Sequence, residues 1–175
     1  MARTARQIAG EGYLVVSNES YHEYEPVGTA LPYNTEGTDR GNAYKIQKTL
    51  AAYDADARAV LDFMKAHAQC NGRLGCFGMC LGGHLAARCA LFPDVSATGC
   101  FFATDIHKHS LSCDGDDTLE RLPDIKGEVV WVWGRQDTHV DRAGREAIKV
   151  ISAMLGSCML ASILHADGTA ALFGG

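Results

Sequence analysis

One cysteine of this chain stands where a catalytic nucleophile is expected. Cys80 lies in the segment Gly78-Met79-Cys80-Leu81-Gly82-Gly83, which follows the Gly-x-Ser-x-Gly pattern of a nucleophile elbow with cysteine in place of serine. Glycines around the nucleophile allow a sharp turn that holds its side chain above the end of a strand. Such a cysteine would attack an acyl group, and the main-chain amide of Leu81 would face the developing oxyanion. The alternative interpretation of Cys80 is a buried structural cysteine.

The elbow needs a strand before it and a helix after it, and both are predicted. Residues 73–77 are short and apolar, as a buried strand would be. Residues 84–91 carry apolar side chains at helical spacing. The order of strand, glycine turn and helix favours acyl-transfer chemistry over a chance match.

Strand-like and helical segments alternate along the whole chain. This order predicts an α/β fold with a mostly parallel sheet flanked by helices. The expected strands are residues 13–17, 73–77, 97–103, 129–133 and 157–164. The expected helices are residues 4–9, 43–69 (with a break near Tyr53), 84–91 and 141–155. Residues 18–42 are predicted to form a long loop, which in a compact domain is usually functional, and residues 104–126 are predicted to be irregular.

Two further residues follow predicted strands and suit a catalytic triad. Asp137 follows the strand at 129–133 and His165 follows the strand at 157–164. Reactive groups collect at the carboxyl ends of parallel strands, and the order nucleophile, acid, histidine is typical of α/β-hydrolases. An imidazole would assist the thiol, and a carboxylate would orient the imidazole. Asp137 could instead be a turn residue and His165 a surface histidine, and His139 is a rival base.

Three segments together resemble the dienelactone hydrolase family of α/β-hydrolases. They are the elbow at 78–83, Tyr21-His22-Glu23 with Pro26-Val27-Gly28-Thr29-Ala30-Leu31, and Gly134-Arg135-Gln136-Asp137. The resemblance covers roughly residues 5–150. It implies hydrolysis of a lactone or activated ester through a thioester on Cys80, with Asp137 as the acid and no cofactor. His165 takes the role of base by its order and approximate spacing.

The chain also departs from the pattern of that family. Members carry an earlier strand and loop that supply a second oxyanion amide and a glutamate near the cysteine, and their histidine lies in a Gly-His-x-Phe context. We therefore expect an α/β-hydrolase-like sheet that lacks its first strands and an atypical carboxyl end, as in an incomplete gene product or an altered reading frame. Catalytic weakening, leaving a binding protein, is the alternative function.

The expected substrate contacts come from the long loop. The resemblance implies roles for Tyr21, His22, Glu23 and Arg40. Members that hydrolyse dienelactone hold its carboxylate with arginines, whose forked donors suit that task. Glu23 stands where one such arginine would fall, and it would repel an anion. We therefore expect a neutral ester or lactone as substrate.

Composition limits the remaining possibilities. The chain has 175 residues, a length that predicts one domain over 1–175. A formal net charge of -5 gives no basis for nucleic-acid binding, and no apolar stretch is long enough for a membrane span. Seven scattered cysteines suggest a reducing cytoplasm. Neither Cys76 with Cys80 nor His107, His109 and Cys113 has the spacing of a metal site, so we expect no metal, and the absence of a Cys-x-x-Cys pair disfavours a redox protein.

Overall fold

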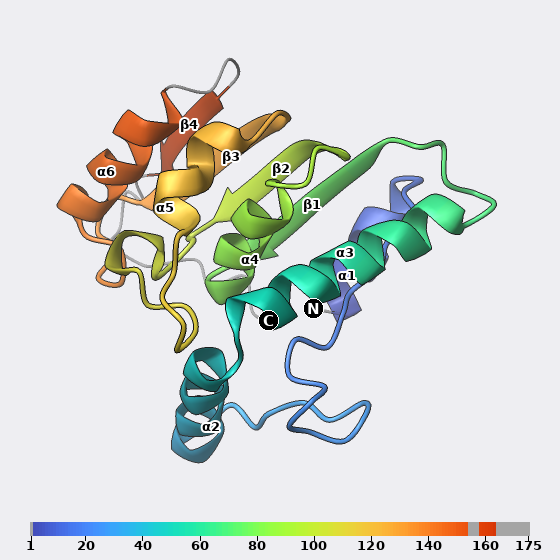
Figure 1. Ribbon diagram of the computed structural model, residues 1–175, viewed down its shortest axis with the longest axis horizontal. Helices are drawn as coiled ribbons and strands as arrows, with labels where there is room; N and C mark the ends of the chain where they lie inside the picture. The colour runs from blue at the N-terminus through green and yellow to red at the C-terminus, as the bar shows by residue number, and fades with distance from the viewer. Residues whose placement is uncertain (1, 154–157, 164–175) are drawn as a thin grey trace.

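Four parallel strands form the sheet that carries the cysteine elbow (Figure 1). In the computed structural model, which describes residues 2–153 and 158–163, the strands lie in the order β1-β2-β3-β4. Their bounds are β1 Leu74–Met79, β2 Val95–Phe101, β3 Glu128–Gly134 and β4 Cys158–Ile163. Because all three pairings are parallel, the carboxyl ends of the strands share one edge of the sheet. The predicted α/β architecture, a parallel sheet flanked by helices, is confirmed.

The described residues also form six α-helices and two short 3-10 helices, of which α3 and α4 contact β1 directly (Figure 1). They are α1 Ala2–Gly10, α2 Thr35–Gln47, α3 Leu50–Ala66, α4 Leu81–Cys89, η1 Ile106–Lys108, α5 Thr118–Arg121, η2 Leu122–Asp124 and α6 Arg142–Ser152. Side-chain caps fix where three of the helices begin. Asn34, Thr49 and Asp141 each accept a hydrogen bond from the main-chain amide three residues further on.

One face of the sheet carries the main hydrophobic core. Trp131 and Trp133 of β3 are buried and their rings stack 5.3 Å apart. Ala87 of α4 and Ile148 of α6 pack in the same cluster, so both helices cover this face. Burial of these side chains is the main force that holds the helices on the sheet and thereby positions the elbow.

The opposite face of the sheet is less covered by the described residues. Phe77 of β1 keeps 38% of its surface exposed and packs against Phe101 of β2, with ring centroids 5.1 Å apart. Side chains alternate between the faces of a strand, so Phe77 and the half-buried Cys76 point to opposite sides.

Three expectations for the amino-terminal half are wrong. Residues 13–17 form no strand and pair with none of the described strands, and a strand without a partner would leave its main-chain groups unpaired. The predicted loop at 18–42 ends early, since α2 begins at Thr35 under its Asn34 cap. The break in the predicted helix 43–69 falls at Lys48 and Thr49, where the backbone is extended, and not near Tyr53.

The region 104–126 is less irregular than its sequence indicates. It contains η1, α5 and η2, whose short lengths give little periodic signal. Phe102, Asp105, His109 and Ser112 adopt positive φ angles in and beside it. Non-glycine residues rarely adopt this conformation, so the loop after β2 is held by its surroundings.

Candidate active site

Cys80 lies at the turn between β1 and α4, as the elbow pattern predicts. Its φ of 55° and ψ of -123° are strained for a residue with a Cβ atom. Its side chain is exposed. A strained and exposed cysteine at the carboxyl end of a strand is suited to nucleophilic attack.

The turn is tight because its main-chain atoms approach one another closely. A Cβ atom placed on Gly78 would collide with the carbonyl group of Gly82, so only glycine fits at Gly78. The amide of Cys80 donates to the carbonyl oxygen of Phe101 at 2.9 Å, which joins the turn to the end of β2. The carbonyl oxygen of Cys80 accepts from the amides of Gly83 and His84 at 3.0 and 3.3 Å.

Helix α4 begins at Leu81, directly after the cysteine. The first amide groups of a helix have no partner within the helix, and its dipole places positive charge there. The amide of Leu81 belongs to this first turn. Its position suits the predicted oxyanion donor, which stays a prediction.

The thiol of Cys80 has one polar side-chain neighbour within the described ranges. Sγ of Cys80 lies 3.9 Å from Oγ1 of Thr104, a buried residue that follows β2. The Thr104 hydroxyl in turn donates to Oδ2 of Asp105 at 3.2 Å. The sequence analysis missed both residues, although their place after a strand at the carboxyl edge was a usable signal.

Asp105 is held by groups from two other elements. Nζ of Lys45 in α2 donates to Oδ2 of Asp105 at 3.1 Å, and the Ser110 hydroxyl donates to Oδ1 at 3.1 Å. Burial raises the pKa of the Asp105 carboxyl, but Lys45 and the hydroxyl groups lower it by more, so the pKa lies below its ordinary value. Asp105 is therefore a carboxylate at neutral pH.

Tyr21 lies within electrostatic reach of the cysteine. Burial raises the pKa of Tyr21 to about 12, a hydrogen bond with Tyr53 opposes this shift, and the charges of Cys80 and Asp105 add to it. Its hydroxyl group therefore keeps its proton near neutral pH. Tyr21 also lines a hollow of about 240 Å³ together with Glu19 and Leu31, among others.

Asp137 follows the end of β3, at the same edge of the sheet as Cys80. Its Oδ1 accepts from the amides of His139 and Val140 at 2.8 and 3.2 Å, so it also stabilises the turn. Its Oδ2 accepts no hydrogen bond from any described residue and could receive an imidazole. His139, the rival base, touches Asp137 through its main-chain amide, and its own position is exposed.

His165 lies outside the described residues. The strand before it, β4, ends at Ile163, which pairs with Gly134 at the end of β3. Within the described part of the chain, no histidine forms a hydrogen bond with Sγ of Cys80. The role of His165 as base stays a prediction.

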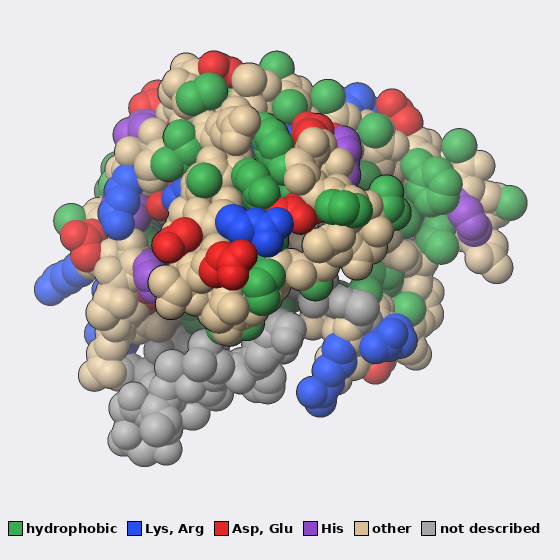
Figure 2. Space-filling view, turned by 90° about the horizontal axis from the view of Figure 1, so that it is seen from below, with side chains coloured by type: hydrophobic (Ala, Val, Ile, Leu, Met, Phe, Trp, Pro, Cys, Tyr) green, Lys and Arg blue, Asp and Glu red, His purple; other side chains and the backbone are tan. Residues whose placement is uncertain are grey.

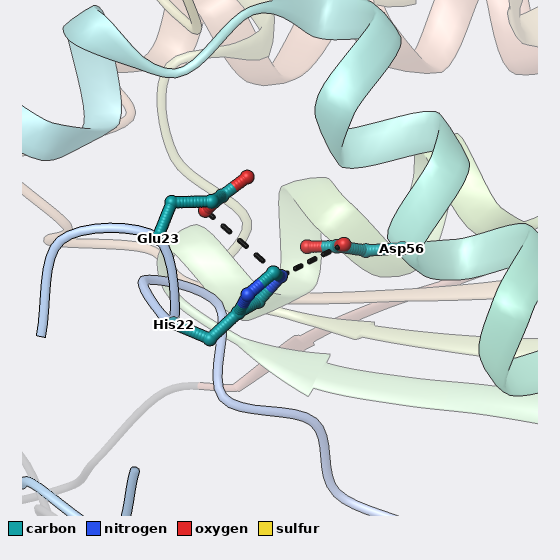
Figure 3. Close-up of side chains that lie close together, drawn as sticks. All are labelled: His22, Glu23 and Asp56. Carbon is teal, nitrogen blue, oxygen red and sulfur yellow. Dashed lines mark hydrogen bonds and ion pairs between the residues drawn. The ribbon is translucent and has the colours of Figure 1, made fainter. Parts of the chain in front are cut away.

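His22 and Glu23 point toward α3, where they form a cluster with Asp56 (Figure 3). Nε2 of His22 lies 3.1 Å from Oδ1 of Asp56 and 3.9 Å from Oε2 of Glu23. Three such ligand atoms, all within 4.8 Å of one another, could in principle hold a metal ion. The sequence analysis did not find this group, because Asp56 is distant in sequence.

A buried lysine already neutralises this cluster. Nζ of Lys48 lies 2.6 Å from Oε2 of Glu23 and 2.6 Å from Oδ2 of Asp56, and its side chain is 0% exposed. A divalent cation bound by these carboxylates would lie beside a buried ammonium group, and their repulsion would be strong. We therefore assign the cluster a structural role, fixing the residues around Tyr21 onto α3.

Arg40 is also engaged away from the cysteine. Its guanidinium group pairs with the carboxylate of Glu25, which accepts a second hydrogen bond from the Tyr44 hydroxyl at 2.8 Å. The hydrogen bonds with Tyr44 and Glu25 raise the pKa of Arg40 above its ordinary value. The expected contacts of His22, Glu23 and Arg40 with substrate stay predictions. In this structure their side chains pair with Asp56, Lys48 and Glu25, respectively.

The other cysteines considered in the sequence analysis have different neighbours. Sγ of Cys76 contacts Thr98 at 3.2 Å and the carbonyl oxygen of Ala86 at 3.3 Å. Its hydrogen bond with Cys89 raises the pKa of Cys76 well above its ordinary value. Cys113 contacts the Gln47 carbonyl at 3.8 Å. Cys76 is thus turned toward α4 and is a thiol at neutral pH.

The chain belongs to the dienelactone hydrolase family, whose sequence profile matches residues 1–157. A Saccharomyces cerevisiae protein provisionally named carboxymethylenebutenolidase is 45% identical over 153 residues, which are 84% of this chain and 55% of that protein. The carboxymethylenebutenolidase of Pseudomonas putida is 27% identical over 150 residues, 85% of this chain and 59% of that protein. The chain thus spans little more than half the length of these relatives.

Solved structures show the same fold. A dienelactone hydrolase-like promiscuous phosphotriesterase from metagenomic libraries superimposes with a TM-score of 0.67 at 15% identity, covering 94% of this chain and 65% of that one. An esterase of Pyrococcus furiosus superimposes with a TM-score of 0.54 at 14% identity, covering 64% of this chain and 53% of that one. At these identities the likeness concerns the fold alone.

None of the described helices has the length and apolar character that crossing a bilayer requires. Acidic and basic side chains lie interspersed with apolar ones on the face viewed in Figure 2. This face therefore shows no large field of a single sign.

Proposed function

We propose that the chain is a carboxylic ester or lactone hydrolase with Cys80 as its nucleophile. The observation that carries this proposal is the elbow itself: an exposed cysteine at φ 55°, between β1 and the first turn of α4. Membership of the dienelactone hydrolase family and the names of the relatives support the same reaction class. The fold positions the nucleophile, and no cofactor is needed for this chemistry.

The proposed reaction has two halves. The thiol of Cys80 passes its proton to a base, and Sγ attacks the carbonyl carbon while the Leu81 amide stabilises the oxyanion. The carbon–oxygen bond then breaks, the leaving alkoxide takes the proton from the base, and a thioester remains on Cys80. A water molecule, deprotonated by the same base, attacks the thioester, and the thiol and a carboxylic acid are released.

We assign the base to His165 and its carboxylate partner to Asp137. Asp137 and Cys80 follow strands β3 and β1, which are separated by β2. Neighbouring strands lie about 4.8 Å apart, so the two side chains start roughly 10 Å apart and need an imidazole between them. His165 has the right order in the sequence, and β4 ends beside the strand that leads to Asp137.

Tyr21 is the best supported of the proposed substrate contacts. Its hydroxyl keeps its proton because of its raised pKa, and it lies within reach of the charge on Cys80. It could therefore donate a hydrogen bond to an ester oxygen. Glu23 stands where an arginine would hold an anionic substrate, and the net charge of the chain is -5, so we expect a neutral ester or lactone as substrate over an anionic one.

Hydrolysis of a neutral activated aryl ester tests the proposal. The purified chain should turn over the ester, and Cys80→Ala and His165→Ala should both reduce the rate to background. Cys113→Ala, which removes another exposed thiol, should leave the rate unchanged. Equal background rates in all variants would contradict the proposal and favour a catalytically inactive protein that binds a ligand.

A further inference from the structure

A chain of polar side chains leads from the candidate nucleophile to a lysine. Sγ of Cys80 contacts Oγ1 of Thr104 at 3.9 Å, and that hydroxyl donates to Oδ2 of Asp105 at 3.2 Å. The same carboxylate oxygen accepts from Nζ of Lys45 at 3.1 Å. The four groups come from the elbow, the loop after β2 and helix α2, so the tertiary fold assembles them.

The chemistry of these groups fixes the direction of the hydrogen bonds. An ionised carboxylate only accepts, so the single proton of the Thr104 hydroxyl must point to Asp105. The hydroxyl then offers only lone pairs to Cys80. A thiol can donate to those lone pairs, whereas a thiolate would face them without receiving a hydrogen bond. In this arrangement the Thr104 hydroxyl can accept a hydrogen bond from the Cys80 side chain but cannot donate one to it.

We propose that Asp105, held by Lys45, orients the Thr104 hydroxyl toward Cys80 and thereby controls the reactivity of its sulfur atom. Thr104 touches the sulfur atom, and Asp105 and Lys45 are positioning residues that act through it. The proposal rests on the proposed function only in treating Cys80 as the nucleophile. In the reaction, loss of the thiol proton to the base would free the hydroxyl to turn from Asp105 and donate to Sγ.

The surroundings of Thr104, Asp105 and Lys45 support such a fixed arrangement. Asp105 has a φ of 69°, a conformation that non-glycine residues rarely adopt, so the surrounding structure must hold its backbone there. The Lys45 side chain is 16% exposed and that of Asp105 is 19% exposed, so solvent screens their pairing only in part. Tyr21 from the loop before α2 and Tyr53 from α3 also face this region, and both remain protonated because burial raises their pKa values.

The rate of alkylation of Cys80 by iodoacetamide tests the proposal without any ester, because the thiolate is the reacting species. The rate is measured across pH from the alkylation of the tryptic peptide of residues 74–88. This peptide contains both Cys76 and Cys80, so its fragments are used to tell which cysteine is alkylated. Asp105→Asn removes a negative charge and frees the hydroxyl to donate to sulfur. We expect alkylation of Cys80 near neutral pH to rise about three- to tenfold. Lys45→Met should lower it by a similar factor.

Double substitution separates the hydroxyl from simple charge effects. In a Thr104→Val background, Asp105→Asn should raise the alkylation rate by clearly less than it does alone, because no hydroxyl remains to turn. Asp39→Asn, the same charge change at an exposed helical site, should leave the rate unchanged. The proposal is overturned if Asp105→Asn and Lys45→Met leave Cys80 as reactive as this control, or if Thr104→Val does not reduce the effect of Asp105→Asn.

The result does not depend on ester hydrolysis. Suppose that the protein fails to hydrolyse esters, but Asp105→Asn speeds alkylation of Cys80 and Lys45→Met slows it. That result would contradict the proposed function and support this inference. A chain that hydrolyses esters but shows no shifts would do the reverse. Circular dichroism verifies that each variant is folded. If Asp105→Asn does not fold, Lys45→Met and Thr104→Val still decide the matter, since with Thr104 removed Lys45→Met should change the rate by less.

Discussion

Nζ of Lys48 lies 2.6 Å from Oδ2 of Asp56, and the lysine side chain is completely shielded from solvent. Glu23 and the carbonyl oxygen of Ser20 also accept from the same ammonium group, at 2.6 and 3.0 Å. Lys48 thereby joins the break between α2 and α3 to the segment that carries Tyr21. The position of the candidate substrate-binding residue thus depends on a buried ion pair outside the site.

Replacement of Lys48 by methionine should destabilise the fold. The change leaves Asp56 and Glu23 without their counter-ion, and we expect the free energy of unfolding to fall by about 2 to 3 kcal/mol. This loss is small for a broken buried ion pair, because Glu23 keeps about a third of its side chain exposed and can be hydrated once Lys48 is gone. Urea denaturation measures the loss. Lys149→Met, at an exposed pair with Glu146, should change stability little, and an equal loss in both would refute the argument.

Arg88 forms a second buried charge network, and its loss should be at least as costly. Its guanidinium binds both carboxylate oxygens of Asp54 at 2.9 and 2.7 Å and Oδ1 of Asp117 at 2.7 Å, with 3% of the side chain exposed. Arg88→Met should lower the free energy of unfolding by about 3 kcal/mol. Thermal or urea denaturation would detect this. The matched variant Arg121→Met, at a 40% exposed side chain, should remain close to the parent.

Two glycines of the elbow should respond differently to alanine. A Cβ atom on Gly78 would meet the carbonyl group of Gly82, so Gly78→Ala should distort the turn and destabilise the chain by several kcal/mol. A Cβ atom on Gly82 would meet nothing within 4 Å. Gly82→Ala should therefore keep its unfolding midpoint or raise it slightly, since alanine favours the helix. Similar midpoints for the two variants would show that the elbow tolerates a side chain at Gly78.

The stability of the chain should fall in acid partly because of Asp116. Burial raises the pKa of its carboxyl, but the interaction with His84, whose Nε2 lies 3.3 Å away, and the hydrogen bonds from Thr118 outweigh this and hold the pKa below its ordinary value of 3.8. A group whose pKa is lowered on folding stabilises the protein above its ordinary pKa, and this stability is lost as pH falls through the folded value. We therefore expect the free energy of unfolding to drop below about pH 4. Asp116→Asn should flatten this dependence, whereas Asp39→Asn should not.

The charge of the substrate provides a further test. The net charge of -5 and the presence of Glu23 in place of an arginine should disfavour an anionic ester, so kcat/KM should be higher for a neutral ester or lactone than for an anionic dienelactone of similar reactivity. Parallel kinetic assays at low and high salt measure the difference. Salt should improve hydrolysis of the anion, because it screens the repulsion. A strong preference for the anion would contradict this prediction.

Local patterns account for the parts of the fold that the sequence predicted well. The glycines around Cys80 predicted a sharp turn, and the apolar runs before Cys80 and at 129–133 predicted strands β1 and β3. These features depend on a few neighbouring residues, whose conformational preferences act locally. The strand expected at 13–17 was wrong for the complementary reason. A strand needs a partner for its hydrogen bonds, and no local pattern reveals whether a neighbour is available.

The sequence by itself identified the family and predicted the nucleophile and the order of the candidate triad. The tertiary structure alone decided what surrounds them. It brought Thr104, Asp105 and Lys45 to Cys80, and it turned Glu23 toward Lys48. Such contacts join residues far apart in the sequence, and they form only when burial of the core brings sheet, helices and loops together. Electrostatic interactions then select their partners by distance and exposure, quantities that a linear pattern does not contain.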